Sequence, residues 1–132
     1  NIFTFNSLMG GAARKGDLAA AERWYREACD AGCQPDRISF NTLMNAAAKR
    51  GDLPAAERWH RRALEMSVKP NIVTFTTLIS AAARSGRLDD AERWYEVAVR
   101  AGAKPSVVTF NALINAAARQ GDLAAAEAWQ SR

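Results

Sequence analysis

Residues 72–106 read IVTFTTLISAAARSGRLDDAERWYEVAVRAGAKPS, and this pattern of 35 residues decides the fold because the chain repeats it. The preceding stretch, 37–71, reads RISFNTLMNAAAKRGDLPAAERWHRRALEMSVKPN and keeps most of the same columns. The same step of 35 separates Trp24, Trp59, Trp94 and Trp129, and also Gly16, Gly51, Gly86 and Gly121. Self-similarity with a period of roughly 20–50 residues predicts a solenoid. The predicted units are 2–36, 37–71 and 72–106, followed by a partial unit, 107–132.

Each unit is predicted to form two helices that meet at its glycine. Apolar residues recur at helical spacing in both halves of the first unit. They are Phe5, Leu8, Met9 and Ala12 in the first half, and Leu18, Ala21, Trp24 and Ala28 in the second. The glycine ends the first helix, because it adopts the left-handed conformation without strain. No segment reads as a strand, so the chain is predicted to be all-α.

Polar residues at the expected helix starts are candidate N-caps, since their side chains can accept bonds from free backbone amides. For the first helices these are Thr4, Ser39, Thr74 and Thr109, and for the second helices Asp17, Asp52 and Asp122. In the third unit the position of these aspartates is occupied by Arg87. We also expect the four tryptophans to be mostly buried between second helices, each in contact with the following unit.

Composition excludes several classes of protein. The chain has 132 residues, 48% of them hydrophobic and 28 of them alanine, which favours packed helices over disorder. No apolar run is long enough to span a membrane. Cys29 and Cys33 are too few for a disulfide framework or a zinc site, and no catalytic or phosphate-binding motif occurs. We therefore expect no enzyme activity, no metal and no cofactor. His60 stands in the column of Tyr25 and Tyr95 and is interpreted as a packing residue.

The positive charge is confined to one half of each unit. The net charge is +4, yet the first-helix segments carry +7 and no acidic residue, while the remaining segments carry −3. One column of cations lies near the ends of the predicted first helices: Arg14, Lys49, Arg84 and Arg119. A cation at a helix C-terminus also complements the helix dipole, which is the alternative explanation for this column.

The repeats resemble the pentatricopeptide repeat (PPR) family. The resemblance rests on KPNIVTFTTLISAAARSGRLDDAERWYEVAVRAGAKPS (69–106) and KPSVVTFNALINAAARQGDLAAAE (104–127), and it covers the whole chain. The constant length of 35 is similar to the P-type subclass. Phenylalanine replaces the family's usual tyrosine, and tryptophan stands where an aliphatic residue is usual. The resemblance implies a right-handed α-solenoid whose first helices line a concave groove. Asn1 occupies the column of Asp36, so we expect the chain to be an internal part of a longer array.

In the family, two residues per unit face each base of a single-stranded RNA, and the resemblance assigns these reading pairs. Asn6 with Asp36 implies uracil, Asn41 with Asn71 implies cytosine or uracil, and Thr76 with Ser106 implies a purine. Asn111 implies a pyrimidine, its partner lying beyond residue 132. The predicted target is 5′-U-C/U-purine-pyrimidine-3′. The wedge residues between successive bases would be Phe3, Ile38, Val73 and Val108, and the column of cations would contact phosphates.

Two functions are consistent with these observations. The first is sequence-specific RNA binding in mitochondria or plastids, in RNA processing, stability or translation. The alternative is a structural, protein-binding solenoid within a large organellar complex. In that case the reading pairs would be only helix caps or loop residues. The variation of the pairs from unit to unit favours the first function, because a scaffold has no need of polar residues there.

Overall fold

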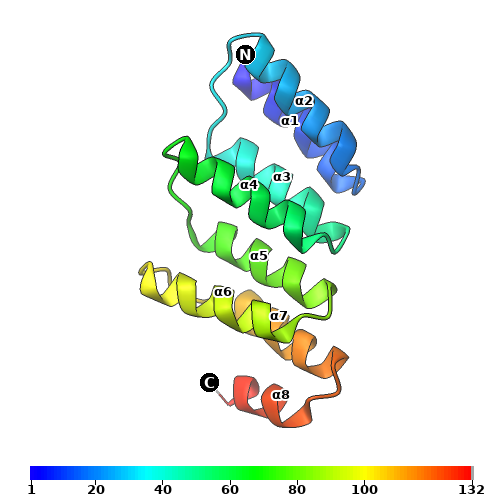
Figure 1. Ribbon diagram of the computed structural model, residues 1–132, viewed down its shortest axis with the longest axis vertical. Coiled ribbons are helices and arrows are strands. Elements are labelled where there is room, and N and C mark those ends of the chain that lie inside the picture. The colour runs from blue at the N-terminus through cyan, green and yellow to red at the C-terminus, as the bar shows by residue number, and fades with distance from the viewer. Residues whose placement is uncertain (132) are drawn as a thin grey trace.

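The computed structural model describes residues 1–131 as a stack of helix pairs (Figure 1). Each predicted unit holds one pair, and the two helices of a pair are antiparallel and joined by a short turn. In the described part of the chain the helices are α1 (Ile2–Arg14), α2 (Leu18–Asp30), α3 (Arg37–Lys49), α4 (Leu53–Glu65), α5 (Ile72–Arg84), α6 (Leu88–Arg100), α7 (Val107–Arg119) and α8 (Leu123–Gln130). Residues 1–131 contain no strand, so the predicted all-α solenoid is confirmed.

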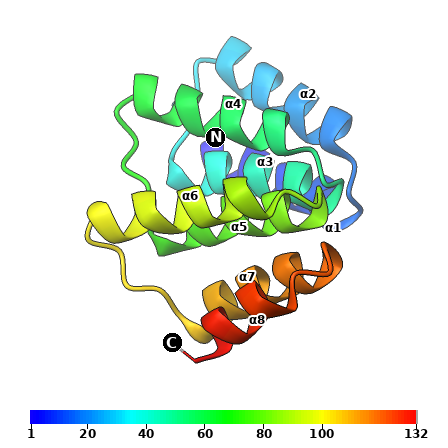
Figure 2. The same cartoon turned by 60° about the horizontal axis from the view of Figure 1, so that its bottom comes forward.

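Two layers build the stack. The first helices α1, α3, α5 and α7 pack directly on one another. Each second helix packs on the first helix of its own unit, and α2, α4 and α6 also pack on the first helix of the next unit. Figure 2 shows the pairs following one another in chain order. Alanine runs at the ends of the first helices, such as Ala46–Ala48 and Ala81–Ala83, are almost fully buried. Their small side chains allow the close approach of neighbouring first helices.

The first helices begin three residues earlier than the sequence indicated. Their N-caps are Asn1, Asp36, Asn71 and Ser106. The predicted caps Thr4, Ser39, Thr74 and Thr109 lie instead at the third helical position. In α3, the backbone N–H of Ser39 donates to Asp36 Oδ1 at 3.1 Å, and that of Asp36 donates to Ser39 Oγ at 3.1 Å. This reciprocal pair is a capping box, with serine in place of the more common glutamate.

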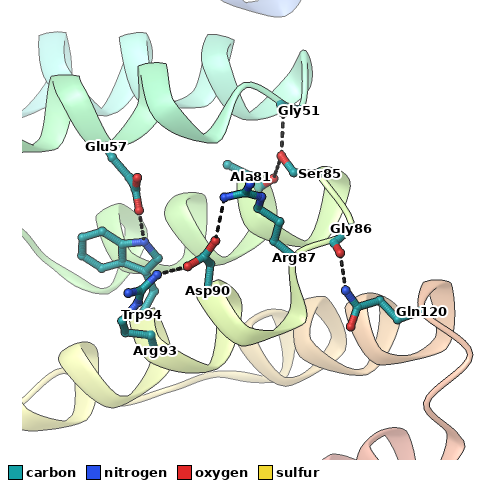
Figure 3. Close-up of polar contacts among 10 residues, drawn as sticks. All are labelled: Gly51, Glu57, Ala81, Ser85, Gly86, Arg87, Asp90, Arg93, Trp94 and Gln120. Carbon is teal, nitrogen blue, oxygen red and sulfur yellow. Dashed lines mark hydrogen bonds and ion pairs between the residues drawn. The ribbon is translucent and has the colours of Figure 1, made fainter.

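The second helices start where predicted. Asp17, Asp52 and Asp122 each accept a backbone N–H three residues on, at 3.0–3.1 Å. Arg87 gives α6 no side-chain cap, and its guanidinium pairs with Asp90 in the first turn at 3.3 Å. Asp90 also pairs with Arg93 (Figure 3). An acidic first turn thus replaces the missing cap, since carboxylates stabilise a helix N-terminus.

The tryptophans form a ladder along the second helices. The indole N–H of Trp59 donates to Glu22, that of Trp94 to Glu57 and that of Trp129 to Glu92, at 2.8–2.9 Å. Figure 3 shows the middle bond, between α4 and α6. Each bond connects a tryptophan to the unit before it. The predicted contact with the following unit was therefore wrong. Trp129 is buried, whereas Trp24, Trp59 and Trp94 are partly exposed, so the predicted burial holds for one of the four.

Polar side chains also connect the turns of neighbouring units. Ser85 Oγ donates to the carbonyl of Gly51 at 2.6 Å, and the amide of Gln120 donates to the carbonyl of Gly86 (Figure 3). Carbonyls of the turns after the first helices are thus partnered by the next unit. These bonds fix the first-helix ends, where the column of cations lies.

Candidate nucleic-acid interface

The predicted phosphate contacts lie in the last turns of the first helices. Arg14, Lys49, Arg84 and Arg119 are all exposed, and none makes an ion pair with another of the described residues. Lys49 Nζ donates to the backbone carbonyl of Arg14 at 3.4 Å, so successive cations are neighbours along the stack. Four exposed cations on helices that contain no acidic residue produce a positive stripe.

The first reading pair is assembled by hydrogen bonds. Asn6 Nδ2 donates to Asp36 Oδ1 at 3.1 Å, although the two residues are 30 positions apart in the chain. Ser39 Oγ lies between them and donates to Asn6 Oδ1 at 2.6 Å. The side chain of Asn6 is therefore held at both ends of its amide. One carboxylate oxygen of Asp36 receives these bonds, which leaves Oδ2 as an available acceptor.

The other two pairs are bridged in the same way. Thr74 Oγ1 donates to Asn41 Oδ1 at 2.7 Å, while the backbone N–H of Thr74 donates to Asn71 Oδ1 at 3.1 Å. In the third unit, the hydroxyls of Thr76 and Thr109 are 3.0 Å apart, and the backbone N–H of Ser106 donates to Thr109 at 3.2 Å. The structure thus brings together the two members of every reading pair.

The wedge residues extend from the first turns of the same helices. Phe3, Ile38, Val73 and Val108 are 79%, 62%, 54% and 63% exposed. They therefore form a column of exposed apolar side chains, one in each unit. The structure places them on the same face as the reading pairs.

Clefts separate the wedge residues. A cleft of about 270 Å³ is bounded by Val73 and Val108, and Thr76 and Ser106 line it. A second, of about 450 Å³, contains Ile38, Val73, Asn41 and Arg14. A third, of about 350 Å³, is lined by Val108, Asn111, Asn115, Arg84 and Arg119, among others. Wedge, polar reader and cation therefore share one hollowed surface, which we call the first-helix face.

One set of residues on this face was not recognised from the sequence. Ser39, Thr74 and Thr109 are only 0%, 2% and 0% exposed, and they connect each reading pair from inside. Their positions at the expected helix starts predicted helix capping alone. The available signal was the column itself, which holds a hydroxyl residue in every unit.

The remaining candidates lie away from this face. His60 is 8% exposed on α4 and packs edge-on against Trp94, with ring centroids 5.1 Å apart, so its packing role is confirmed. Cys29 and Cys33 are free thiols. Within residues 1–131, no three His, Cys, Asp or Glu side chains gather as a metal site would require. None of the described helices has the length and apolar character needed to cross a membrane.

Comparison with known proteins identifies the family. The model of the PPR repeat family matches residues 1–49, 35–84 and 70–119, and the chain therefore belongs to this family. No curated protein matches the sequence.

Solved structures show the same architecture. The chain is similar to the pentatricopeptide repeat protein PPR10 from maize, with 25% identity and a TM-score of 0.82 over 99% of this chain. A structure of PPR10 in complex with an 18-nt psaJ RNA element gives 25% identity and a TM-score of 0.87 over 98%. The chain spans 19% of the length of PPR10 in both. The PPR domain of Arabidopsis thaliana protein-only RNase P 1, in complex with tRNA, shares the fold at 14% identity, with a TM-score of 0.62 over 99% of this chain and 88% of that domain.

Proposed function

We propose that the chain binds single-stranded RNA on its first-helix face, with one base per unit. The observation that carries the proposal is the assembly of three separate reading pairs beside a stripe of four unpaired cations. Phosphate contacts with the cations supply affinity, and polar contacts with base edges supply specificity. Each base lies in a cleft between two wedge residues.

The chemistry of the pairs supports the order 5′-U-C/U-purine-pyrimidine-3′. Asp36 offers a carboxylate acceptor to the ring N–H of uracil, beside the amide of Asn6. Asn41 and Asn71 both have their oxygens bonded to Thr74, which leaves two amide donors for the acceptors of cytosine. Thr76 with Ser106 presents two hydroxyls and is proposed to face a purine, and Asn111 is proposed to face a pyrimidine.

The RNA complex of PPR10 supports this proposal, because that protein has the same fold and is among the more similar structures. A location in mitochondria or plastids, and a role in RNA processing, stability or translation, are part of the same proposal. The alternative of a protein-binding scaffold leaves the four cations and the exposed wedge residues without a function. We propose no catalytic activity for the repeats themselves.

Replacing Asn71 with Asp tests the proposal at one base. The change supplies an acceptor in place of a donor, so the preference at the second base should move from cytosine toward uracil. A bidentate base contact contributes about 1–3 kcal/mol of discrimination in DNA, which sets the upper range expected here. The measurement is binding of four RNAs of sequence 5′-UNAU-3′, with common flanks, that differ only at N.

The structure makes this substitution well controlled. Aspartate caps α3 at the equivalent position, so Asn71→Asp should preserve the cap of α5. The preferences at the other three bases should remain unchanged, because each unit contacts its own base. Equal losses of affinity for all four RNAs would show that Asn71 serves only as a helix cap.

A further inference from the structure

The buried hydroxyl column of Ser39, Thr74 and Thr109 connects each unit to the reading residue of the unit before it. Each hydroxyl lies 33 positions after that residue and meets it at 2.6, 2.7 or 3.0 Å. A buried hydroxyl requires a hydrogen-bond partner. Here the partner is the side chain that the proposed function assigns to the base.

The contacts of Thr74 determine which way Asn41 points. Thr74 Oγ1 accepts the backbone N–H of Asn71 at 3.2 Å. Its proton has two possible acceptors, Asn71 Oδ1 at 3.1 Å and Asn41 Oδ1 at 2.7 Å, and the shorter contact directs it to Asn41. The amide oxygen of Asn41 is therefore turned into the protein and its NH₂ group toward the groove. The two ends of an amide have opposite hydrogen-bonding character, so this orientation presents a donor to the base.

We propose that the hydroxyl column consists of positioning residues, which fix the amide orientation of the preceding reading residue and thereby its base preference. This inference rests on the proposed function. It makes the specificity of each unit depend on a residue of the next unit that does not touch RNA.

The units differ in how strongly they depend on this column. Asn6 is also held through its Nδ2, which donates to Asp36 at 3.1 Å. Asn41 has only the bond from Thr74 among the hydrogen bonds of the described residues. In the third unit the reading residue is Thr76, which has no amide to invert. The second unit is therefore the most sensitive, and the third provides a matched control.

The test is Thr74→Val, which keeps a β-branched side chain but removes the hydroxyl. Without the bond to Thr74, Asn41 can turn its oxygen to the groove and accept the ring N–H of uracil. The preference for cytosine over uracil at the second base of 5′-UNAU-3′ RNAs should fall roughly 2- to 10-fold, the range equivalent to one hydrogen bond. Thr74→Ser should restore it.

The control is Thr109→Val. It removes an equivalent buried hydroxyl from the start of α7, so it matches the structural loss without releasing an amide. Both valine variants should lose overall affinity to a similar extent, but only Thr74→Val should change the ratio of cytosine to uracil binding. Circular dichroism of each variant checks that the helices are retained.

Three outcomes decide the inference. An unchanged cytosine preference in folded Thr74→Val overturns it and leaves the proposed function intact. A wild-type chain without any preference at this base removes the proposed function and the inference together. If Thr74→Val does not fold, Thr74→Ala replaces it. Thr74→Ala should lower the preference for cytosine over uracil at the second base, and a preserved preference there counts against the inference.

Discussion

Ser67 stands at a position where the first and third units have glycine. Its φ of 60° lies in the left-handed region, as do those of Gly32 (80°) and Gly102 (83°). A side chain there costs about 1–2 kcal/mol, because its Cβ approaches the following carbonyl. Ser67→Gly should therefore raise the free energy of unfolding by about 0.5–1 kcal/mol, after the greater entropy of unfolded glycine is subtracted. Urea denaturation measures this, and Ser67→Ala, which keeps the strain, should show no gain.

His60 is a second residue that differs from its equivalents, because the first and third units have tyrosine at this position. Burial lowers the pKa of its imidazole from the ordinary value of 6.5, and the nearby carboxylate of Glu57 offsets only part of this effect. Its Nδ1 has no hydrogen-bond partner among the described residues. A cleft of about 510 Å³ lies beside it, lined also by Arg61 and Arg93. The equivalent Tyr25 instead carries a hydroxyl that meets Met66 Sδ at 3.6 Å.

This difference predicts a pH dependence of stability. The unfolded imidazole binds a proton near pH 6.5, whereas the folded one does so only at lower pH. Between these two pKa values the unfolded state holds more protons, so stability falls as the pH drops below about 6.5. His60→Tyr should remove this loss and raise the melting temperature. Melting curves of both proteins between pH 5 and 7.5 test this, and parallel pH profiles would contradict it.

At the scale of the element, the indole–carboxylate ladder connects consecutive second helices. Trp59→Phe keeps an aromatic ring beside Tyr25 but removes the donor to Glu22, whose side chain is 19% exposed. A hydrogen bond to a charged group contributes about 1.5–3 kcal/mol, and partial exposure reduces this to an expected cost of about 1–2 kcal/mol. Urea denaturation should show this loss.

Trp24→Phe is the matched control for that prediction. Trp24 occupies the same column in the first unit, and its indole N–H makes no hydrogen bond to another of the described residues. Its ring packs on Phe5, with centroids 6.5 Å apart. Trp24→Phe should therefore cost less than Trp59→Phe. Equal costs for the two changes would show that ring packing, and not the ladder, accounts for the stabilisation.

The helices themselves were predictable, whereas the contacts between units were not. The glycine column and the apolar spacing indicated each helix pair and its turn. The helix starts were misplaced because Ser39 and Asp36 can both serve as a cap, and their reciprocal bonds are visible only in three dimensions. The bond between Trp59 and Glu22 spans 37 positions and depends on how the units stack. The same is true of the bridge from Ser39 to Asn6.

At the scale of the whole molecule, the stack turns a periodic sequence into a periodic surface. Each unit contributes its own functional residues to the first-helix face. These residues line up into columns because the first helices pack directly on one another. Each reading pair lies within one unit, but the hydroxyl that bridges it belongs to the next unit. A unit transferred to another array should therefore keep its specificity only if the following unit supplies the matching hydroxyl.

The stripe of cations leads to the last prediction. If Arg14, Lys49, Arg84 and Arg119 each contact one phosphate, the slope of log affinity against log salt should be about −3, from ~0.7 per contact on single strands. Changing all four to glutamine should bring this slope close to zero. The matched control changes four exposed arginines of the second helices, which removes the same net charge: Arg23, Arg26, Arg61 and Arg100. The control should retain most of the slope, because its charges lie away from the first-helix face. Equal flattening in both variants would mean that RNA responds only to net charge, and a slope that survives the first set of changes would place the phosphates on another surface.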